Sequence, residues 1–291
     1  GDGSHGFQKG DRVFGMLPII GNPWGGLAEL VAADASVFAK APSSIPLVEA
    51  AALPLVGLTV MQTLASAGLE APPAVMLAAA DSQPPVQQRA LVQAAAGGVG
   101  SFAVQYLRNV LRFSEVLATA SPANAEFVAA LGATRTIDYH TEQFEAVASA
   151  AGGVDVVLDP MAWSYMDRTL GGAGGAGSGM LRPAAKYCHI LSSDWASNDM
   201  ERDPLLALKG PLMKWTSRAR RLLRRDAPQV FSSAVQPDGA GLAQLARLVD
   251  AGRLKPVVGR VFEGLEQAVE AFELLETGHA RGKVVVRVSS E

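Results

Sequence analysis

The stretch “RALVQAAAGGVGSFAVQYL”, residues 89–107, decides how this chain folds. An apolar run with the composition of a strand leads through Gly97, Gly98 and Gly100 into an apolar segment with the composition of a helix. A strand, a tight glycine turn and a helix in this order can cradle a pyrophosphate with backbone N–H groups and the helix N-terminus. The same residues also suit a plain small-residue bend, so the flanking sequence has to decide between a phosphate-binding turn and such a bend.

The sequence after residue 88 alternates between strand and helix composition. The expected strands are “RALVQAA”, “EVLATA”, “TRTID”, “VDVVLD” and “AAKYCHILSS”, and the expected helices are “VGSFAVQYLRNVL”, “PANAEFVAALG” and “EQFEAVASA”. This spacing indicates βαβ units and a parallel sheet. The glycine stretch therefore opens an α/β domain, which is the context that a dinucleotide-binding motif requires.

The glycines follow the pattern A-x-G-x-x-G, with Ala95 in the place of the first glycine of G-x-G-x-x-G. An alanine can make this turn if its φ stays negative, while Gly97 permits close backbone approach to a phosphate and Gly100 permits close packing of helix on strand. We therefore expect a dinucleotide site at this turn.

The end of the next strand predicts which dinucleotide binds. An acid about 20 residues after the turn would bind the ribose 2′-OH of NAD, but Thr119, Ala120 and Ser121 stand there. With no carboxylate to repel a 2′-phosphate, and with Ser121 and Asn124 as donors, the sequence favours NADP(H). Ser121 followed by a proline equally suits an ordinary helix N-cap.

The remainder of the chain is organised around this domain. Short apolar runs broken by turn residues at 11–40 predict an antiparallel, barrel-like sheet, and Pro54 should separate two helices within 46–67. A loop is expected at 70–88, a glycine-rich surface loop at 171–179 and a less regular segment at 194–237. The helix “GLAQLARLVDAGRLKP”, the strand “VVGRVF”, the helix “LEQAVEAFELLETG” and the strand “KVVVRV” close the chain.

Composition excludes several classes of protein. The single cysteine, Cys188, excludes an intrachain disulfide and a multi-cysteine metal site. A formal net charge of −3 provides no global field for nucleic acid or an acidic membrane surface. The histidines stand in unrelated contexts, are interpreted as surface or capping residues and predict no zinc site; they are His5, His140, His189 and His279.

Six segments resemble the medium-chain dehydrogenase/reductases in their order: “FQKGDRVFG”, “GGLAELV”, “EAAALPLVGLTVMQTL”, “AAAGGVGSFAVQ”, “LGATRTIDY” and “GHARGKVVVRV”. The resemblance is strongest to the zinc-free quinone oxidoreductase branch, and within it to the mitochondrial reticulon-interacting and chloroplast-envelope groups. It implies a partial GroES-like β-barrel domain at 1–55 and a Rossmann NADP(H)-binding domain at 56–262 with an insert near 194–237. Residues 263–291 would form a helix and strand that return to the GroES-like domain.

The resemblance implies an NADPH-dependent oxidoreductase of the quinone oxidoreductase type, which passes hydride directly to a quinone or to an activated C=C or carbonyl substrate without zinc. It assigns no catalytic side chain. By position it implies cofactor contacts at Thr59, Gly97, Gly98, Val99, Gly100, Ser121, Asn124, Tyr139, Asp159, Leu191 and Ser192. The Thr59 hydroxyl equally suits helix packing and Tyr139 a half-buried core position. Lys283 is open between a phosphate contact and a surface cation, and the surface is favoured.

Departures from the family pattern support a second hypothesis. The family carries roughly 80 to 100 residues before “GDRV”, about the size of a domain, so we expect that the natural chain begins before Gly1 and that the substrate lobe is incomplete. Pro160 and “MAWSYMD” replace the usual glycine turn. The alternative function is therefore a catalytically degenerate relative that serves as a structural or interaction subunit of a larger organellar assembly.

The basic run and the family resemblance also suggest partners and a location for the protein. The basic run from Lys214 to Arg225 suits a solvated helix face or a surface that docks an acidic partner, anionic lipid or RNA. A homodimer through a sheet edge formed by “KYCHILSS” and its neighbours is a family-based expectation. A mitochondrial or plastid location, with a soluble or peripheral protein, is expected from the resemblance alone, and no segment is apolar for long enough to span a bilayer.

Overall fold

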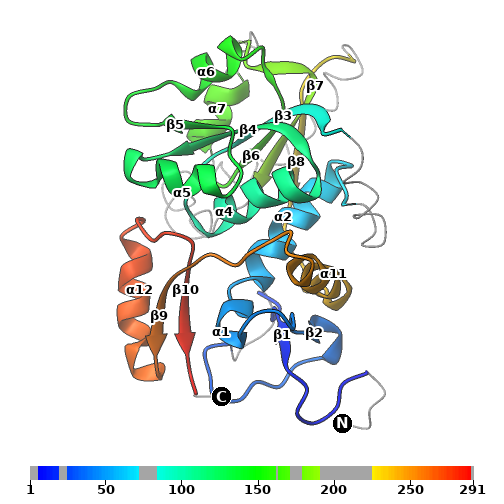
Figure 1. The fold of residues 1–291 in the computed structure, drawn as a ribbon, viewed down its shortest axis with the longest axis vertical. Helices are drawn as coiled ribbons and strands as arrows, with labels where there is room; N and C mark the ends of the chain where they lie inside the picture. Colours follow the sequence, from blue (N-terminus) through cyan, green and yellow to red (C-terminus); the bar gives the residue numbers. More distant parts are fainter. Residues whose placement is uncertain are drawn as a thin grey trace, which may run out of the picture.

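The computed structural model describes residues 6–19, 25–71, 84–161, 163–170, 179–190 and 225–289 (Figure 1). Leu191, Ser192 and residues 214–224 of the basic run lie outside these ranges. The described residues form a large part built on one sheet and a smaller part to which both ends of the chain contribute (Figure 1).

The large part is a parallel sheet with strand order β5–β4–β3–β6–β7–β8. Its strands are β3 (Val86–Val92), β4 (Phe113–Ala120), β5 (Arg135–Asp138), β6 (Val154–Asp159), β7 (Leu181–Ile190) and β8 (Gln229–Ser233). β3 has β4 on one side and β6 on the other, so the strand order reverses there, and open α/β sheets bind ligands at such a reversal. The predicted doubly wound parallel sheet is confirmed.

Helices cover both faces of this sheet. One face packs against α2 (Pro54–Ser66) and α4 (Gly98–Gln105), which continues into the short π-helix η2 (Tyr106–Val110). The other face packs against α6 (Phe144–Ala150) and α7 (Trp163–Leu170). Neighbouring strand residues such as Leu91 and Val92 belong to these two different apolar clusters because side chains alternate across a strand.

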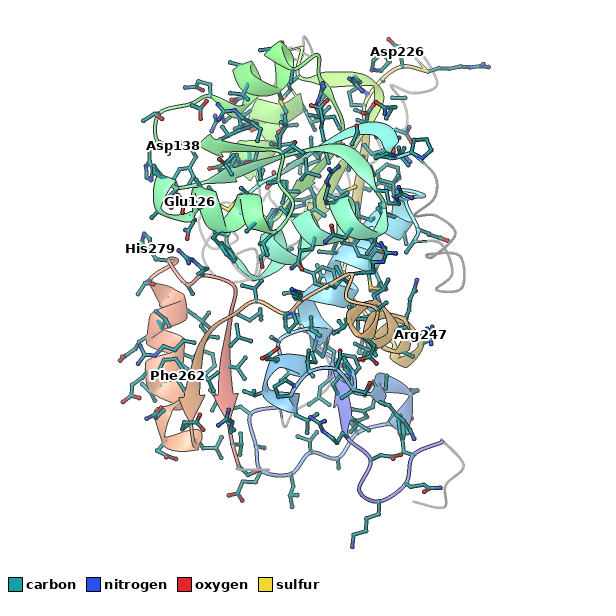
Figure 2. All side chains as sticks on the ribbon, viewed as in Figure 1. Glu126, Asp138, Asp226, Arg247, Phe262 and His279 are labelled. Carbon is teal, nitrogen blue, oxygen red and sulfur yellow. The ribbon has the colours of Figure 1, made fainter. Side chains whose placement is uncertain are left out.

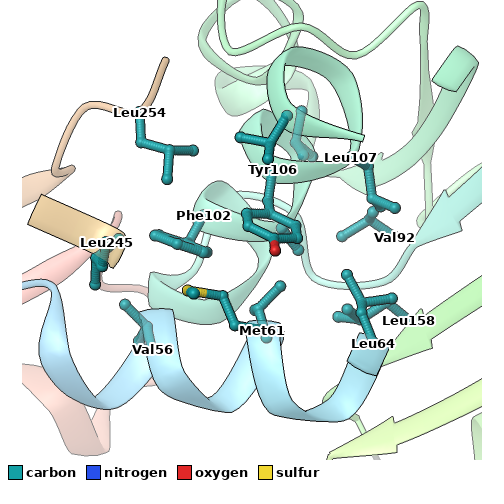
Figure 3. Close-up of a cluster of buried hydrophobic side chains, with 14 of the residues drawn as sticks. Val56, Met61, Leu64, Val92, Phe102, Tyr106, Leu107, Leu158, Leu245 and Leu254 are labelled. Carbon is teal, nitrogen blue, oxygen red and sulfur yellow. The ribbon is translucent and has the colours of Figure 1, made fainter. Parts of the chain in front are cut away.

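The contact between α2 and α4 is a continuous apolar interface (Figure 3). Phe102 and Tyr106 stack at 6.0 Å and meet Met61 and Leu64 of α2, all buried. Pro54 is the first residue of α2, as predicted, and α1 (Leu47–Ala50) precedes it. This interface fixes the start of α4 relative to the segment that leads in from the smaller part.

In the smaller part, the described residues form two separate pairs of strands together with helices. β1 (Val13–Gly15) pairs antiparallel with β2 (Phe38–Lys40), preceded by η1 (Ala35–Val37), whereas β9 (Val258–Glu263) pairs parallel with β10 (Lys283–Arg287). The helix α11 (Gly239–Asp250) leads toward β9, and η5 (Leu265–Gln267) and α12 (Ala268–Glu276) connect β9 to β10. The predicted domain limit at residue 262 falls inside this second pair, because β9 joins β10 and not the large sheet.

Four expectations for the large part need correction. The segment 194–237, predicted as less regular, contains β8, which forms the sheet edge; β7 with “KYCHI” is paired on both sides and is not a free edge. His189, predicted at the surface, is buried in β7 because β6 and β8 flank it. The segment predicted as a loop at 70–88 ends in the first residues of β3.

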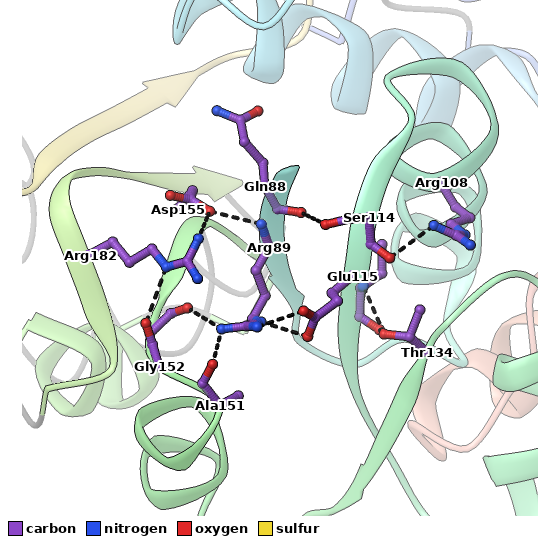
Figure 4. Close-up of polar contacts among 12 residues, drawn as sticks. Gln88, Arg89, Arg108, Ser114, Glu115, Thr134, Ala151, Gly152, Asp155 and Arg182 are labelled. Carbon is purple, nitrogen blue, oxygen red and sulfur yellow. Dashed lines mark hydrogen bonds and ion pairs between the residues drawn. The ribbon is translucent and has the colours of Figure 1, made fainter. Parts of the chain in front are cut away.

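A polar network closes the amino-terminal edge of the sheet, opposite the glycine turn (Figure 4). The Arg89 guanidinium forms a two-point pair with Glu115, at 2.6 and 2.7 Å, and also donates to the carbonyls of Ala151 and Gly153. Its backbone N–H donates to Asp155 at 2.8 Å. Arg89 therefore ties β3 to β4, to β6 and to the loop between α6 and β6, which is a structural role.

Candidate cofactor site

The turn after β3 is held by the neighbouring strand. The Ala94 N–H donates to the Thr119 hydroxyl at 3.0 Å, and the Ala95 N–H donates to the Thr119 carbonyl at 2.9 Å. The left-handed residue is Ala94, with φ of 49°, and not Ala95, the residue in the place of the first glycine. The φ of Ala95 is therefore negative, as an alanine at this place in the turn requires, and the backbone strain lies at Ala94, one residue earlier.

The glycines of the turn have different surroundings. A Cβ on Gly100 would lie 2.2 Å from the Ala94 carbonyl oxygen and 2.6 Å from the Ala95 Cα, so the packing of α4 on the turn requires glycine there. A Cβ on Gly97 would meet only the Ala94 oxygen, at 3.5 Å, in ordinary contact. Packing within the described residues therefore does not require glycine at position 97, so its physical reasons are its suitability as the N-cap of α4 and the room it leaves for a ligand to approach the backbone.

The helix α4 presents its first turn to the space beside these glycines. Gly97 is its N-cap, with φ of −76° and no side-chain cap. The first intrahelical bond is donated by Ser101 to the Gly97 carbonyl, so the earlier amides, including those of Val99 and Gly100, have no intrahelical acceptor. Such amides, together with the helix dipole, favour an anion.

A fully buried amide lies directly before the turn. The Gln93 side-chain oxygen accepts a 2.8 Å hydrogen bond from the Thr119 hydroxyl, and its Nε2 has no hydrogen-bond partner among the described residues. Leaving a buried N–H unsatisfied costs about 1–3 kcal/mol. The Gln93 side chain thus ties the end of β3 to Thr119 of β4, and the open amides of α4 are the donors that fit a phosphate group.

The end of the chain docks onto the same turn. The Gly282 N–H donates to the Ala96 carbonyl at 2.8 Å, and Gly282 forms a bridge with Gly97. Lys283 follows, with its Cδ 2.6 Å from the position that a Cβ on Gly98 would take, and burial lowers the pKa of its ammonium. The expectation that favoured a surface location for Lys283 is wrong: its side chain is largely buried beside the helix N-terminus, where a cation complements an anionic ligand.

The far end of the site lies beyond β4 and β5. Their register pairs Ala120 with Asp138, so Ser121 and Tyr139 follow side by side at the carboxyl edge. Ser121 is the N-cap of η3 (Pro122–Asn124), but its hydroxyl caps no backbone amide and instead accepts from the Asn124 side chain at 3.2 Å. α5 (Ala125–Ala130) follows η3 directly. Tyr139 is exposed, at 48%, beside His140 and belongs to neither apolar cluster, so the core alternative for it is wrong.

Arg281 reaches this far end from the other end of the chain. Its Nε donates to Asn124 Oδ1 at 2.9 Å across a sequence separation of 157 residues, and its Nη2 donates to the Ala123 carbonyl at 3.3 Å. Figure 2 labels His279, two residues before Arg281, and Glu126, two residues after Asn124. The sequence analysis predicted no cation at this place, and only the arginine in “GHARGK” could have indicated one.

Two predicted contacts have other partners. The Thr59 hydroxyl donates to the Leu55 carbonyl of its own helix at 2.7 Å, which is the helix-packing alternative. Asp159 ends β6 at the predicted edge, but its carboxylate is fully buried, where it accepts from the Tyr187 hydroxyl and the Met161 N–H. Burial raises its pKa to about 6. Asp159 therefore fixes the loop after β6 and does not offer its carboxylate to a ligand.

The family of the chain follows from comparison with known proteins. A family model described as “Zinc-binding dehydrogenase” matches residues 131–286, more than half of the chain. The chain belongs to the zinc-binding dehydrogenase family. The predicted resemblance to medium-chain dehydrogenase/reductases is thereby confirmed.

Similar proteins within this family are named as oxidoreductases. The chain is 30% identical over 286 residues to the “Chloroplast envelope quinone oxidoreductase homolog” of Arabidopsis thaliana, covering 98% of this chain and 75% of that one. It is 27% identical to the mitochondrial “NAD(P)H oxidoreductase RTN4IP1” of Danio rerio, covering 98% of this chain and 68% of that one.

A solved structure extends the comparison to the cofactor. The quinone oxidoreductase of Thermus thermophilus, determined also as its complex with NADPH, is 28% identical and superposes with a TM-score of 0.60 over 91% of this chain and 74% of that one. The relatives are thus longer than this chain, which spans about two thirds to three quarters of their length.

Proposed function

We propose that this chain binds NADPH across the glycine turn and acts as an oxidoreductase of the quinone oxidoreductase type, reducing a quinone or an activated C=C or carbonyl compound. The observation that carries the proposal is the meeting of three elements at the strand-order reversal. The turn after β3, the open first turn of α4 and the end segment with Lys283 converge there. The names of the relatives, quinone oxidoreductase and NAD(P)H oxidoreductase, agree with it.

The residues of the site bind and orient the cofactor, which supplies hydride when bound. The amides of Val99 and Gly100 meet the pyrophosphate, and the Lys283 ammonium balances its charge. The absence of a carboxylate at Thr119–Ser121, with the hydroxyl of Ser121 and the amide of Asn124 in its place, favours NADPH over NADH. Orientation of the reacting carbon against the substrate is the main catalytic contribution expected from the protein.

The proposed reaction uses no zinc. Catalytic zinc needs three protein ligands from His, Cys, Asp or Glu, and no group of three such residues gathers within the described ranges. Cys188 is fully buried in β7, and burial raises the pKa of its thiol to about 12, which disfavours the thiolate form that binds metals. Hydride transfer that needs only orientation and backbone donors agrees with this set of residues.

The second candidate function is a degenerate relative that serves as a subunit of a larger assembly. It is favoured by the small lobe, in which the described residues form only two separate pairs of strands, β1–β2 and β9–β10. In this case the nucleotide would bind without turnover, and the basic run Lys214–Arg225 would contact a partner. An organellar location remains part of the proposal, because the similar proteins are named chloroplastic or mitochondrial. A homodimer also remains part of the proposal, as an expectation from the family resemblance alone. Within the described residues no helix is long and apolar enough to cross a membrane.

One titration separates these possibilities. The full chain is titrated with NADPH while the cofactor fluorescence is followed, and a soluble quinone is then added while absorbance of the reduced cofactor is recorded. Saturable binding followed by quinone-dependent oxidation supports the enzyme. Binding without oxidation supports the degenerate subunit, and no binding by a folded chain refutes both the cofactor site and the function.

A further inference from the structure

The structure assigns to Arg281 the selection of NADPH over NADH at the adenosine 2′-phosphate, an assignment that rests on the proposed cofactor site. Arg281 stands at the carboxyl end of β4, where its Nε donates to Asn124 Oδ1 at 2.9 Å and Asn124 in turn donates to the Ser121 hydroxyl at 3.2 Å. In a doubly wound sheet this edge, one strand away from the glycine turn, receives the adenosine ribose.

The position of Arg281 relative to the turn is fixed by the backbone. The next residue, Gly282, donates to the Ala96 carbonyl at 2.8 Å, and Lys283 donates its N–H to the Val257 carbonyl at 2.8 Å. Gly282 has a φ of 65°, and a Cβ there would lie 2.4 Å from the Val257 carbonyl oxygen, so this docking requires glycine. The segment 281–283 therefore spans the site, with Lys283 beside the pyrophosphate turn and Arg281 at the ribose end.

The charge of Arg281 is available to an anion. Its hydrogen bonds go to neutral acceptors, the Asn124 amide and the Ala123 carbonyl, and its guanidinium lies 4.9 Å from the centre of the Phe127 ring. None of the ion pairs found among the described residues includes Arg281. Several other arginines of the large part are ion-paired, Arg89 with Glu115, Arg135 with Glu142 and Arg168 with Glu145, whereas Arg108, like Arg281, donates to backbone carbonyls.

The hydrogen bonds that position Arg281 leave several of its guanidinium N–H groups able to donate to a phosphate. Bonds from Nε and Nη2 use one edge of the guanidinium, and the remaining N–H groups can donate to phosphate oxygens together with Ser121 and Asn124. Glu126, exposed in the first turn of α5, is the nearby carboxylate in the sequence and would oppose the phosphate. Selection then follows from a charge-assisted contact that NADH, with a hydroxyl at this position, cannot make.

The test uses small probes that carry only the adenosine end. Equilibrium binding of adenosine 2′,5′-bisphosphate and of adenosine 5′-monophosphate to the full chain is measured by calorimetry, alongside NADPH and NADH. In Arg281→Ala the affinity for the bisphosphate and for NADPH should fall by about 10- to 100-fold, whereas the affinity for the monophosphate and for NADH should change by less than about threefold.

Arg260→Ala is the matched control, since Arg260 also lies over an aromatic ring, at 4.4 Å from the centre of Phe262, but on β9, where its register partner is Val284 of β10. It should leave all four affinities unchanged, and thermal unfolding checks that both variants are folded. Equal weakening of both adenosine probes in Arg281→Ala would show a merely structural role, and unchanged preference for the 2′-phosphate would assign selection to other residues. Either outcome overturns the inference about Arg281. The proposed function is tested separately, because it depends on whether the wild-type chain binds NADPH.

Discussion

Replacing Gly97 with alanine separates the ligand-binding role of the glycine turn from its structural role. Gly97 has a φ of −76°, which alanine adopts freely, and an added Cβ would meet only the Ala94 oxygen, at 3.5 Å. Glycine-to-alanine changes at such positions stabilise by about 0.4–1 kcal/mol through the unfolded chain, whereas alanine is a poorer N-cap than glycine by a similar amount. These effects oppose each other, so the free energy of unfolding of Gly97→Ala should stay within about 1 kcal/mol of the wild type.

Cofactor binding should respond differently. If the pyrophosphate approaches the backbone at Gly97, the new methyl group occupies space between the two. Overpacking of this kind costs about 1–3 kcal/mol, which corresponds to roughly a 5- to 150-fold loss of NADPH affinity. The measurement pairs urea unfolding with a fluorescence titration of NADPH on the same preparation.

Gly100→Ala is the contrasting variant in the same turn. Its Cβ would lie 2.2 Å from a backbone oxygen that no side-chain rotation can move. The helix-propensity gain of about 1 kcal/mol cannot offset this clash, so the variant should be destabilised by about 2 kcal/mol or more. If Gly97→Ala binds NADPH as tightly as the wild type at unchanged stability, the turn does not contact the phosphates and the reasoning fails.

Four further changes test other parts of the structure. Ala94→Gly should raise the free energy of unfolding by about 1 kcal/mol, because the φ of 49° strains alanine and not glycine; urea unfolding measures it. Arg89→Met should lower it by about 1–3 kcal/mol, since it removes the two-point pair with Glu115 and leaves two carbonyls without a donor, and an unchanged midpoint in urea would contradict this. The folded-state pKa of Asp159 is raised to about 6, so its favourable contribution is present at low pH and is lost as pH rises through that value. The wild type should therefore lose up to about 3 kcal/mol of stability relative to Asp159→Asn between about pH 4 and pH 7, and parallel pH profiles would refute the shift. Lys283→Ala should weaken NADPH and NADH about equally, by roughly 3- to 10-fold, because its cation lies at the shared pyrophosphate end; titrations with both cofactors check this.

The site could be predicted from sequence where its parts are local. Gly97, Val99 and Gly100 lie where the strand–turn–helix pattern places them. Ser121 and Tyr139 follow two strands whose ends were evident from composition, and the β4–β5 register brings them together. The structural alternative for Thr59 was also recognised in the sequence, and its hydroxyl bonds within its own helix.

The parts that sequence reasoning missed depend on contacts between distant segments. Arg281 meets Asn124 across 157 residues, so no local spacing could place a cation at the ribose end. Asp159 was predicted as a contact from its position at the end of a strand, but whether its carboxylate points outward depends on Tyr187 of the next strand. His189 was predicted at the surface, but its strand β7 is paired with β8 as well as β6, and its side chain is buried.

The sequence by itself determined the order of strands and helices, the glycine turn and the parallel sheet, because periodicity and glycine conformation act over a few residues. Only the tertiary structure decided that β9 pairs with β10, that β8 closes the sheet and that the segment 281–283 lies across the turn. Strand partners and long-range side-chain contacts are set by which apolar faces and backbone groups remain unsatisfied after local structure has formed, and this is a property of the whole chain.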